Sequence, residues 1–322
     1  MGVDLSVVIS AHNPSSARLT RTLCGLSSQT LAPERWELVL VDNASTPPLA
    51  LDLSALPTSH LVREDRLGLT FGRIAGMERS RAPIIVLVDD DNVVGPSYLE
   101  SVLAIFAHEP RLGAVGGKSM PDWEAGSPRA WVEEFRDQLA LRNFGEEAQI
   151  AALAGSCEYP ACSPIGAGMA FRRAAVQSWL ASCRAGGAPT DRRGRDLSSA
   201  GDCDMVMFAL KDGWQVGYFP ELEMTHVIPE GRTTREYLGR LNYGIAKSWV
   251  QFLARHGTRP WSKVSRVGAW LRKARAYVRY QAWAGPAQYV RWRGVCGTFD
   301  GRALIPMNPI VQGSPPAGGV VT

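Results

Sequence analysis

The sequence lacks several features by which a protein class can be recognised at once. No apolar run approaches the roughly 18 residues of a membrane-spanning helix, so we expect none. The chain begins with a strand-like run, without the basic segment and apolar core of a secretory signal, so we expect no signal peptide. The six cysteines are dispersed and include no C-x-x-C pair, which argues against a disulfide framework and a zinc site. Together these absences favour a reduced, cytoplasmic setting.

Two phosphate-binding motifs are also missing. The chain has no G-x-x-x-x-G-K-S/T sequence and no G-x-G-x-x-G sequence, which excludes a P-loop and a dinucleotide fingerprint. Acidic residues are absent from one long stretch, since residues 237–299 hold twelve Lys or Arg and no Asp or Glu. Subtracting these twelve charges from the net charge of +4 leaves −8 for the rest of the chain. The basic character therefore belongs to the C-terminal part alone.

What the sequence does contain centres on residues 83–92. Six apolar residues, most of them β-branched, run directly into Asp89, Asp90 and Asp91. Such a run predicts a strand buried on both faces, as in a parallel sheet, and ligands bind at the carboxyl ends of those strands. Adjacent carboxylates repel one another unless a cation is bound, and oxygen ligands suit Mg²⁺ or Mn²⁺. The alternative is a solvated turn in which one aspartate caps the next helix.

Strands and helices are expected to alternate in the first third of the chain. Residues 5–11, 36–41 and 60–62 have the composition of strands, and helical spacing follows the first and the third. This alternation predicts an α/β fold with a mostly parallel sheet. Beyond it, further strands are expected at residues 112–117, 163–171 and 215–219.

Polar loops follow three of these strands. His12-Asn13 follows the first, Asp42-Asn43 the second, and the three aspartates end the strand at residues 83–88. Right-handed crossovers bring the carboxyl ends of parallel strands to one edge of the sheet. We therefore expect a nucleotide-sized site at that edge.

Taken in order, these motifs resemble the family-2 glycosyltransferases of the GT-A fold, over roughly residues 5 to 232. The resemblance implies a nucleotide-sugar-binding half at residues 1–118 and an acceptor-binding, catalytic half at 119–232. A basic amphipathic helical region at 233–300 and a disordered tail at 301–322 complete the expected organisation. The motifs are Asn13, Asp42-Asn43 with Ser45, Gly68 with Arg73 and Gly76, Asp89 with Asp91, Gly166-Ala167-Gly168-Met169 with Arg172-Arg173, Asp202 and His226.

The resemblance also implies roles for individual residues. Asp202 is expected to be the catalytic base, although Ala200 and Gly201 replace the first two residues of the family's Gly-Glu-Asp signature. Asp91 is the expected main ligand of Mn²⁺ or Mg²⁺, with Asp89 and His226 beside it. The nucleotide is expected to contact Ala11, Asn13, Asp42, Arg73, Asp89 and Asp90. The acceptor is expected to contact Trp123, Gly166, Gly168, Met169 and Asp204.

Each of these assignments has a structural alternative. Asp202 or Asp204 can cap the helix that starts near Cys203, and Asp204 is the second choice for the base. The Asp42 loop can be a simple turn, and His226 can be an ordinary residue at a strand end. Trp123 can belong to the core or the surface rather than stack on a sugar.

The basic C-terminal region predicts a location for the protein. A capping box at Thr233 and Glu236 opens one helix, and residues 264–282 form a second, with Lys and Arg around an apolar face. Half of the ten tryptophans lie in residues 237–299. Basic, Trp-rich amphipathic helices dock on anionic membranes, which would place the protein peripherally at the inner face of the cell membrane. The alternative is that these helices pack on the catalytic part; nucleic acid is not an expected partner.

The function that follows is a metal-dependent, inverting glycosyltransferase. It would move a sugar from a nucleoside-diphosphate sugar to a hydroxyl of a glycan or lipid-linked acceptor, in the synthesis of a surface polysaccharide. A sugar-nucleotide pyrophosphorylase would need a Gly-rich, Lys/Arg-bearing triphosphate loop near the N-terminus, which His12-Asn13-Pro14-Ser15 does not supply. A non-enzymatic scaffold acting through its basic helices is the third possibility. The sequence indicates no oligomeric state.

Overall fold

The computed structural model describes residues 2–153, 158–187, 191–192 and 197–305. Its elements up to residue 123 are β1 (Leu5–Ala11), α1 (Ser16–Ser27), β2 (Trp36–Asn43), β3 (Ser59–Glu64), α2 (Leu69–Arg79), β4 (Ile84–Val88), β5 (Asn92–Val94), α3 (Tyr98–His108) and β6 (Leu112–Trp123). After them come β7 (Gln149–Ala151), β8 (Ala170–Arg172), α4 (Gln177–Ser182), α5 (Gly201–Lys211), β9 (Gln215–Ile228), α6 (Arg235–Arg255), α7 (Arg266–Arg279) and α8 (Pro286–Leu304).

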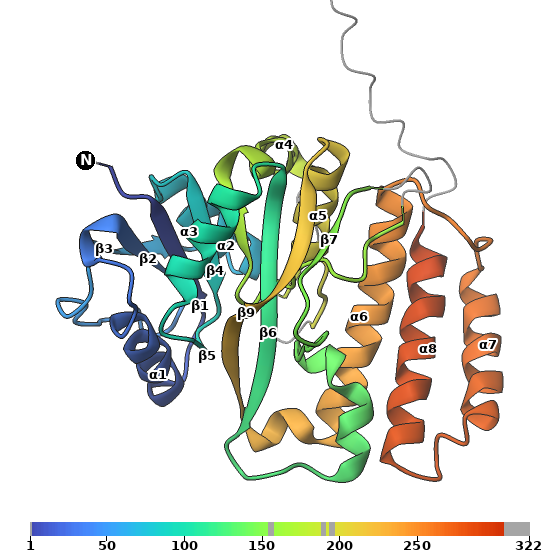
Figure 1. The fold of residues 1–322 in the computed structure, drawn as a ribbon. Coiled ribbons are helices and arrows are strands. Elements are labelled where there is room, and N and C mark those ends of the chain that lie inside the picture. Colours follow the sequence, from blue (N-terminus) through green and yellow to red (C-terminus); the bar gives the residue numbers. More distant parts are fainter. Residues whose placement is uncertain (1, 154–157, 188–190, 193–196, 306–322) are drawn as a thin grey trace, which may run out of the picture.

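Within the described residues, nine strands form one mixed sheet. Its order is β3-β2-β1-β4-β8-β6-β9-β5, and β7 pairs with β9. Strands β3, β2, β1 and β4 are parallel, whereas the short β8 is antiparallel to both of its neighbours. In Figure 1, helices α6, α8 and α7 stand in a row beside the sheet, on the side away from β3. The α/β architecture with a mostly parallel first half is the one that the sequence predicts.

Each face of the central strands has its own core. Val7 and Ile9 of β1 pack into one cluster with α1 and α3, and Val8 packs into the other with α2, α4 and α5. The same alternation places Val86 and Leu87 of β4 on opposite faces. Because both faces are covered, these strands are almost wholly apolar until they end. Runs of polar residues begin where these strands end, which puts the polar loops at the sheet edge.

Two strands are longer than the sequence indicates. β6 continues to Trp123 and β9 to Ile228, and the two pair in parallel along most of their length, with register irregularities near Leu112 and Gly116. The boundary predicted between residues 118 and 119 therefore falls inside β6, and the two predicted halves share one sheet. The strand predicted at 163–171 is confined to β8, because Gly168 has a φ of +72° and turns the chain just before it.

The C-terminal helices are part of the folded body. Leu238 and Leu241 of α6 and Val290 of α8 form a third core cluster with Phe135 and Ile228, so these two helices pack on the preceding part of the chain. The N-cap of α6 is Thr234, whose side chain accepts a hydrogen bond from the backbone N–H of Tyr237; the capping box predicted one residue earlier is wrong.

Helix α8 has no counterpart in the sequence-based expectations. It extends to Leu304, so the disordered tail predicted from residue 301 is wrong for residues 301–304. Ile305, just after the helix, is buried, and residues 306–322 of that predicted tail lie outside the described residues. Among the helices that the structure describes, none has both the length and the apolar character needed to cross a bilayer.

Candidate active site

Two adjoining cavities form a cleft at the carboxyl ends of the parallel strands. The first, of about 250 Å³, is lined by residues including His12, Asn43 and the three aspartates. The second, of about 210 Å³, is lined by residues including Arg73, Gly166 and Asp202. Leu69, Asp89 and Arg192 line both cavities, so the two are halves of one cleft. The convergence of three strand-end loops on one edge of the sheet is thereby confirmed.

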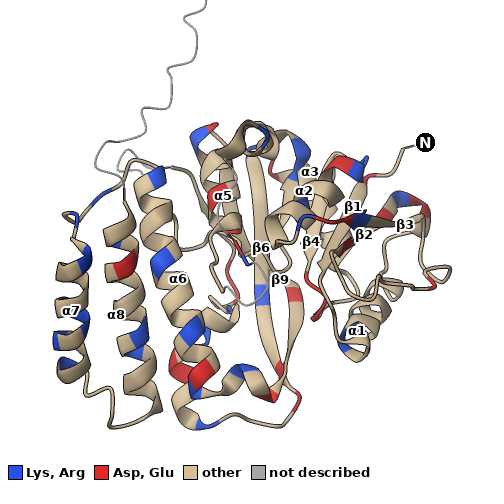
Figure 2. Ribbon diagram, turned by 180° about the vertical axis from the view of Figure 1, so that it is seen from behind, with Lys and Arg blue, Asp and Glu red and all other residues tan. Residues whose placement is uncertain are grey.

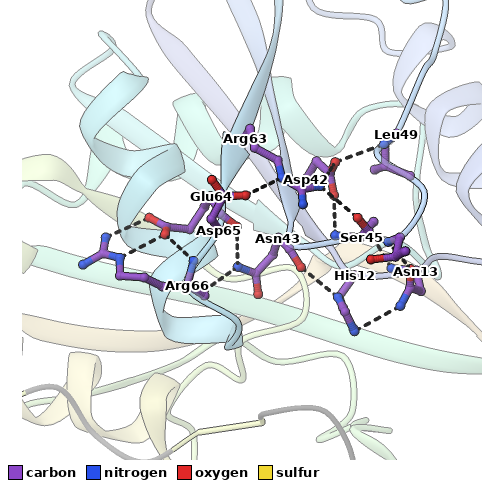
Figure 3. A network of polar contacts seen from close by, with 11 residues as sticks. His12, Asn13, Asp42, Asn43, Ser45, Leu49, Arg63, Glu64, Asp65 and Arg66 are labelled. Atoms are coloured by element: carbon purple, nitrogen blue, oxygen red, sulfur yellow. Dashed lines mark hydrogen bonds and ion pairs between the residues drawn. The ribbon is translucent and has the colours of Figure 1, made fainter.

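Hydrogen bonds fasten the first two loops to each other (Figure 3). The backbone N–H of Asn13 donates to Ser45 Oγ at 2.9 Å, and Asn13 Oδ1 accepts from the Thr46 N–H at 2.9 Å. Asn43 Oδ1 accepts from the Gly68 N–H at 2.9 Å, which places the start of α2 against the loop. The side chain of Asn13 therefore supports the loop, whereas His12 and Asn43 line the first cavity.

Asp42 organises its own loop. Its carboxylate accepts hydrogen bonds from the backbone N–H groups of Ser45 and Leu49, both at 3.0 Å, and from Arg63 at 2.6 Å (Figure 3). Burial opposes ionisation of this carboxyl, but the hydrogen bonds from Ser45, Leu49 and Arg63 outweigh it and lower its pKa to about 2. Asp42 is 3 % exposed and Ala11 is 1 % exposed, and neither lines the cavity. The turn alternative therefore describes Asp42 better than the predicted nucleobase contact.

The three aspartates after β4 are held in different electrostatic states. Asp89 faces Arg73, with 3.3 Å between Oδ1 and Nη2. Burial, followed by the negative charges of Asp91 and Asp89, raises the pKa of Asp90 to about 7. Burial also disfavours the charge of Asp91, but the adjoining His226 and Arg232 outweigh it and hold the pKa of Asp91 well below its usual range. The repulsion expected among the three carboxylates is thus relieved by two arginines, one on each side.

His226 and Arg232 both face Asp91. Arg232 Nη2 lies 2.9 Å from Asp91 Oδ2, and Arg232 Nη1 lies 3.0 Å from His226 Nε2. His226 Nδ1 lies 2.9 Å from the carbonyl oxygen of Leu139. Because a carbonyl oxygen only accepts, Nδ1 carries the proton. Nε2 is left to face Asp91 Oδ1, 3.6 Å away. Sequence reasoning missed Arg232, which lies in a short turn after β9 with no motif of its own.

Asp91 and His226 fit a divalent metal as a pair of ligands once Arg232, which now contacts Asp91 Oδ2 and His226 Nε2, turns away from them. A metal-binding histidine commonly donates its other ring N–H to a carbonyl or carboxylate, as His226 does here. Asp89 does not join them, because it faces Arg73, and the described residues contain no group of three His, Cys, Asp or Glu side chains placed to hold a metal. Mg²⁺-type ions often take one or two protein ligands and complete their shell with substrate phosphates. The pair therefore suits a metal that is bound together with a diphosphate.

Asp202 lies in the first turn of α5 and faces the second cavity. Its Oδ2 accepts from the Gly166 N–H at 2.8 Å, and its Oδ1 accepts from the Cys203 N–H at 2.9 Å. The N-cap of α5 is Ala200, so Asp202 is not the N-cap residue. A Cβ atom on Gly166 would lie 2.6 Å from Arg73 Nη2, so a larger residue at this position would displace the Arg73 guanidinium. The structure thus brings Asp202 and Gly166 into one cavity with Arg73, which the sequence analysis assigns to the nucleotide.

A further carboxylate, Asp191, completes this cavity. A Cβ atom on Gly201 would lie only 2.3 Å from Asp191 Oδ2. Burial disfavours the charged form of Arg73, but the charges of Asp89, Asp191 and Asp202 outweigh it and raise the Arg73 pKa above its ordinary value. Asp191 therefore fills the space beside the backbone of Gly201, where the family signature has a glutamate. Sequence reasoning missed Asp191, because a lone aspartate in an Arg- and Gly-rich segment carries no pattern.

The remaining acceptor predictions do not reach the cleft. Met169 is 1 % exposed in the core, and the Gly168 carbonyl accepts a hydrogen bond from the hydroxyl of Tyr98. Trp123 packs against the third core cluster and lines neither cavity. The aromatic residues that do line the cleft are Tyr237 in the first cavity and Trp249 in the second, both from α6.

Asp204 lies on the buried side of α5, away from both cavities. It accepts from Trp179 Nε1 at 3.0 Å, and its Oδ1 lies 2.8 Å from His256 Nε2 and 3.1 Å from Arg255 Nε. With 0 % exposure it has no path to an acceptor. Its predicted acceptor contact, and its use as the second choice of base, are therefore wrong.

The family model described as glycosyl transferase family 2 matches residues 6–177, which is just over half of the chain. The chain belongs to glycosyl transferase family 2. Among relatives of this family-2 chain, the validoxylamine A glucosyltransferase of Streptomyces hygroscopicus subsp. limoneus is 32 % identical over 160 residues, 44 % of this chain and 33 % of the relative. The glucosyl-dolichyl phosphate glucuronosyltransferase of Haloferax volcanii is 30 % identical over 88 residues, 27 % of this chain and 28 % of the relative. The matches thus span only about a third of these relatives' own length.

The fold of the family-2 chain is shared with solved structures. The S. aureus TarS 1-349 crystal structure in complex with UDP superposes with a TM-score of 0.50, over 93 % of this chain and 90 % of that chain, at 15 % identity. TarS has also been crystallised with UDP-GlcNAc, and that structure superposes equally well. At this identity the similarity concerns the fold alone. It confirms the predicted GT-A type architecture.

Replacing Asp204 by Ala is expected to destabilise the family-2 fold without changing its chemistry. The substitution would leave Arg255 and His256 without their buried partner, and breaking a buried pair from one side costs about 3–5 kcal/mol. Chemical denaturation should therefore show a lower free energy of unfolding, while turnover per folded molecule stays at the parent value. A variant that unfolds like the parent but has lost activity would return Asp204 to the list of candidate bases.

Proposed function

We propose that this family-2 protein transfers a sugar from a nucleoside-diphosphate sugar to a hydroxyl group of an acceptor. The observation that carries the proposal is the two-part cleft, with Asp91, His226 and Arg232 at one end and Asp202 in the adjoining cavity. TarS, which has the same fold, binds UDP and UDP-GlcNAc. The pyrophosphorylase and scaffold alternatives do not call for a carboxylate in the second cavity.

Two separate sets of groups suit an inverting displacement. In that reaction the acceptor oxygen attacks one face of the sugar while the nucleoside diphosphate leaves from the other. Asp202 Oδ1 and Oδ2 are available to accept the proton of the acceptor hydroxyl, which typically accelerates such a step by about 10²–10⁴. The backbone N–H groups of Gly166 and Cys203 fix the orientation of this carboxylate.

The leaving diphosphate is assigned to the first cavity. Arg232 already faces that cavity and can pair with phosphate oxygens, since guanidinium and phosphate form strong charge-assisted hydrogen bonds. We assign Asp91 and His226 as the protein ligands of Mn²⁺ or Mg²⁺. When bound, the metal would act as a Lewis acid that stabilises the negative charge of the departing diphosphate.

The names of the relatives point to two kinds of acceptor, a lipid-linked sugar and a free sugar-like compound. The Haloferax volcanii relative is named for a glucosyl-dolichyl phosphate acceptor, and the Streptomyces relative for validoxylamine A. We propose a glycan or lipid-linked acceptor, used at the cytoplasmic face of a membrane in the synthesis of a surface polysaccharide. Tyr237 and Trp249 are aromatic surfaces in the cleft against which a sugar ring can pack.

A panel of nucleotide sugars, each with and without Mn²⁺, tests the proposed donor. A ligand present at 100 times its Kd stabilises the folded state by about 2.7 kcal/mol, which thermal shift detects. We expect one nucleoside-diphosphate sugar to raise the melting temperature only with the metal present. If no nucleotide sugar stabilises the protein under either condition, the proposal fails. Stabilisation by a nucleoside triphosphate with a sugar phosphate would favour a pyrophosphorylase instead.

Exchanging the carboxylate between positions 191 and 201 tests the role of Asp191. We expect Asp191→Ala to lower turnover by roughly tenfold, because Arg73 loses one of its charge partners and shifts in the cavity. Gly201→Glu alone should also lower turnover, since its Cβ would clash with Asp191. The double variant should recover most of the activity, in kcat rather than in KM for the donor. If the double variant loses as much turnover as the two single variants combined, Asp191 does not take the place of the glutamate.

A further inference from the structure

Helix α7 has three distinct faces. Its inner face packs on α8 through Ala269 and Ala276, and Lys273 extends this contact to Asp300, with Nζ 2.7 Å from Oδ1. On a different face, Val267, Leu271 and Val278 follow one another at helical spacing. These side chains are exposed by 71 %, 55 % and 63 %, so the apolar face that the sequence predicts points to solvent rather than to the protein.

Aromatic residues extend this apolar strip. Trp270 is 64 % exposed, and Trp283, just beyond the helix, is 58 % exposed. Soluble proteins seldom expose so many large apolar side chains side by side, and a patch of this kind marks an interaction site. We call Val267, Trp270, Leu271, Val278 and Trp283 the α7 strip.

Basic residues flank the α7 strip. Arg272, Arg275 and Arg279 are exposed and follow one another at helical spacing on the side of α7 next to the strip. Figure 2 shows Lys and Arg bands along α7 and no acidic band. Because residues 237–299 contain no Asp or Glu, no acidic side chain of that stretch opposes this charge.

We propose that the α7 strip and its flanking arginines dock the protein on an anionic lipid bilayer. Apolar side chains beside cationic ones match the interface of such a bilayer, where acyl chains lie beneath negatively charged headgroups. Tryptophan rings favour the headgroup level, which suits Trp270 and Trp283. A second copy of this chain would carry the same positive charge on the same face, so self-association through α7 would bring like charges together.

Docking through α7 would leave the cleft open. The cleft is lined by α6, whereas α7 packs on α8 and is the outermost helix of the row in Figure 1. The use of a lipid-linked acceptor depends on the proposed function. Binding of α7 to vesicles does not depend on that function. The two ideas can therefore fail separately.

Co-sedimentation of the full-length protein with vesicles tests the docking. Vesicles of phosphatidylcholine with a graded content of phosphatidylglycerol are used, at low and high salt. We expect binding to need the anionic lipid and to weaken with salt. Arg275→Gln with Arg279→Gln should weaken it by roughly 25-fold, since each basic side chain near an anionic surface contributes about 1 kcal/mol. Arg111→Gln with Arg129→Gln, two exposed arginines outside the C-terminal helices, is the matched control and should bind like the parent.

A second variant tests the apolar part. Trp270→Ser with Val278→Ser removes two exposed side chains without opening the core, so the fold should be kept, and vesicle binding should fall at least tenfold. Binding of nucleotide sugar should be unchanged in all these variants, which separates this test from that of the proposed function. Equal binding to neutral and anionic vesicles, or to neither, overturns the proposal. So does a parent protein that self-associates, without binding vesicles, and is made monomeric by the serine variant.

Discussion

Asp202→Asn should lower turnover by roughly 10²-fold or more while the affinity for the nucleotide sugar stays close to that of the parent. Asparagine keeps the size of the side chain, and its oxygen can still accept the hydrogen bond from the Gly166 N–H. It cannot take a proton from an acceptor hydroxyl at neutral pH, so only the step that needs a base is affected. Donor affinity from calorimetry and kcat from steady-state kinetics separate the two effects.

Asp204→Asn is the control for this experiment. Asp204 lies on the same helix, but its carboxylate is directed at Trp179 and His256, away from the cleft. Its asparagine variant should keep the turnover of the parent per folded molecule. If Asp202→Asn keeps near-normal turnover as well, the carboxylate only orders the first turn of α5, and the base must be sought elsewhere in the second cavity.

Asp91→Ala should weaken Mn²⁺-dependent binding of the nucleoside diphosphate by at least about tenfold, the scale seen when metal-site residues are lost. Adding EDTA should weaken diphosphate binding by the parent by the same factor. It should not weaken binding by the variant any further. The repulsion between Asp91 and its neighbours disappears in the variant, but so does the pairing with Arg232 at 2.9 Å. The low pKa of Asp91 indicates that the pairing outweighs the repulsion, so the variant should be less stable than the parent in the absence of metal.

Calorimetric titration with and without EDTA measures all four combinations of variant and metal. Asp212→Ala, which removes an exposed carboxylate at the end of α5, should behave like the parent. Diphosphate binding that ignores both EDTA and Asp91→Ala would mean that Arg232 and the loop N–H groups bind it without a metal.

The parallel half of the fold could be predicted because its strands are buried on both faces. A strand such as β4, with all five residues buried, leaves a short apolar run that polar loops must end. The direction of that run fixes the edge at which Asp89, Asp90 and Asp91 appear. Asp202 could be found because it stands at the expected place in the ordered motifs of a known family. In each case a local pattern carried the information.

The rest of the site depends on contacts between distant segments. Asp191 gains its place from the missing side chain at Gly201, a space that only the folded chain defines. Helix α6 lines the cleft because α8 and residues 130–139 hold it from the other side. The continuation of β6 past residue 117 could not be predicted, because Lys118 and Pro121 interrupt its apolar run. For α7 the spacing of apolar residues was read correctly, but spacing alone does not reveal whether that face meets protein or solvent.

The continuous pairing of β6 with β9 also bears on how acceptor specificity could be changed. A chimera that joined the first 118 residues of this chain to the rest of another family member would cut β6 in its middle. Strand β9 of the other protein would then pair with a β6 whose first half comes from this chain. Acceptor preference is therefore better transplanted through units that end at the surface, such as α6 with its Tyr237 and Trp249 together with the α8 residues that support it. Designed hybrids that respect this should fold, whereas those cut between the two halves should not.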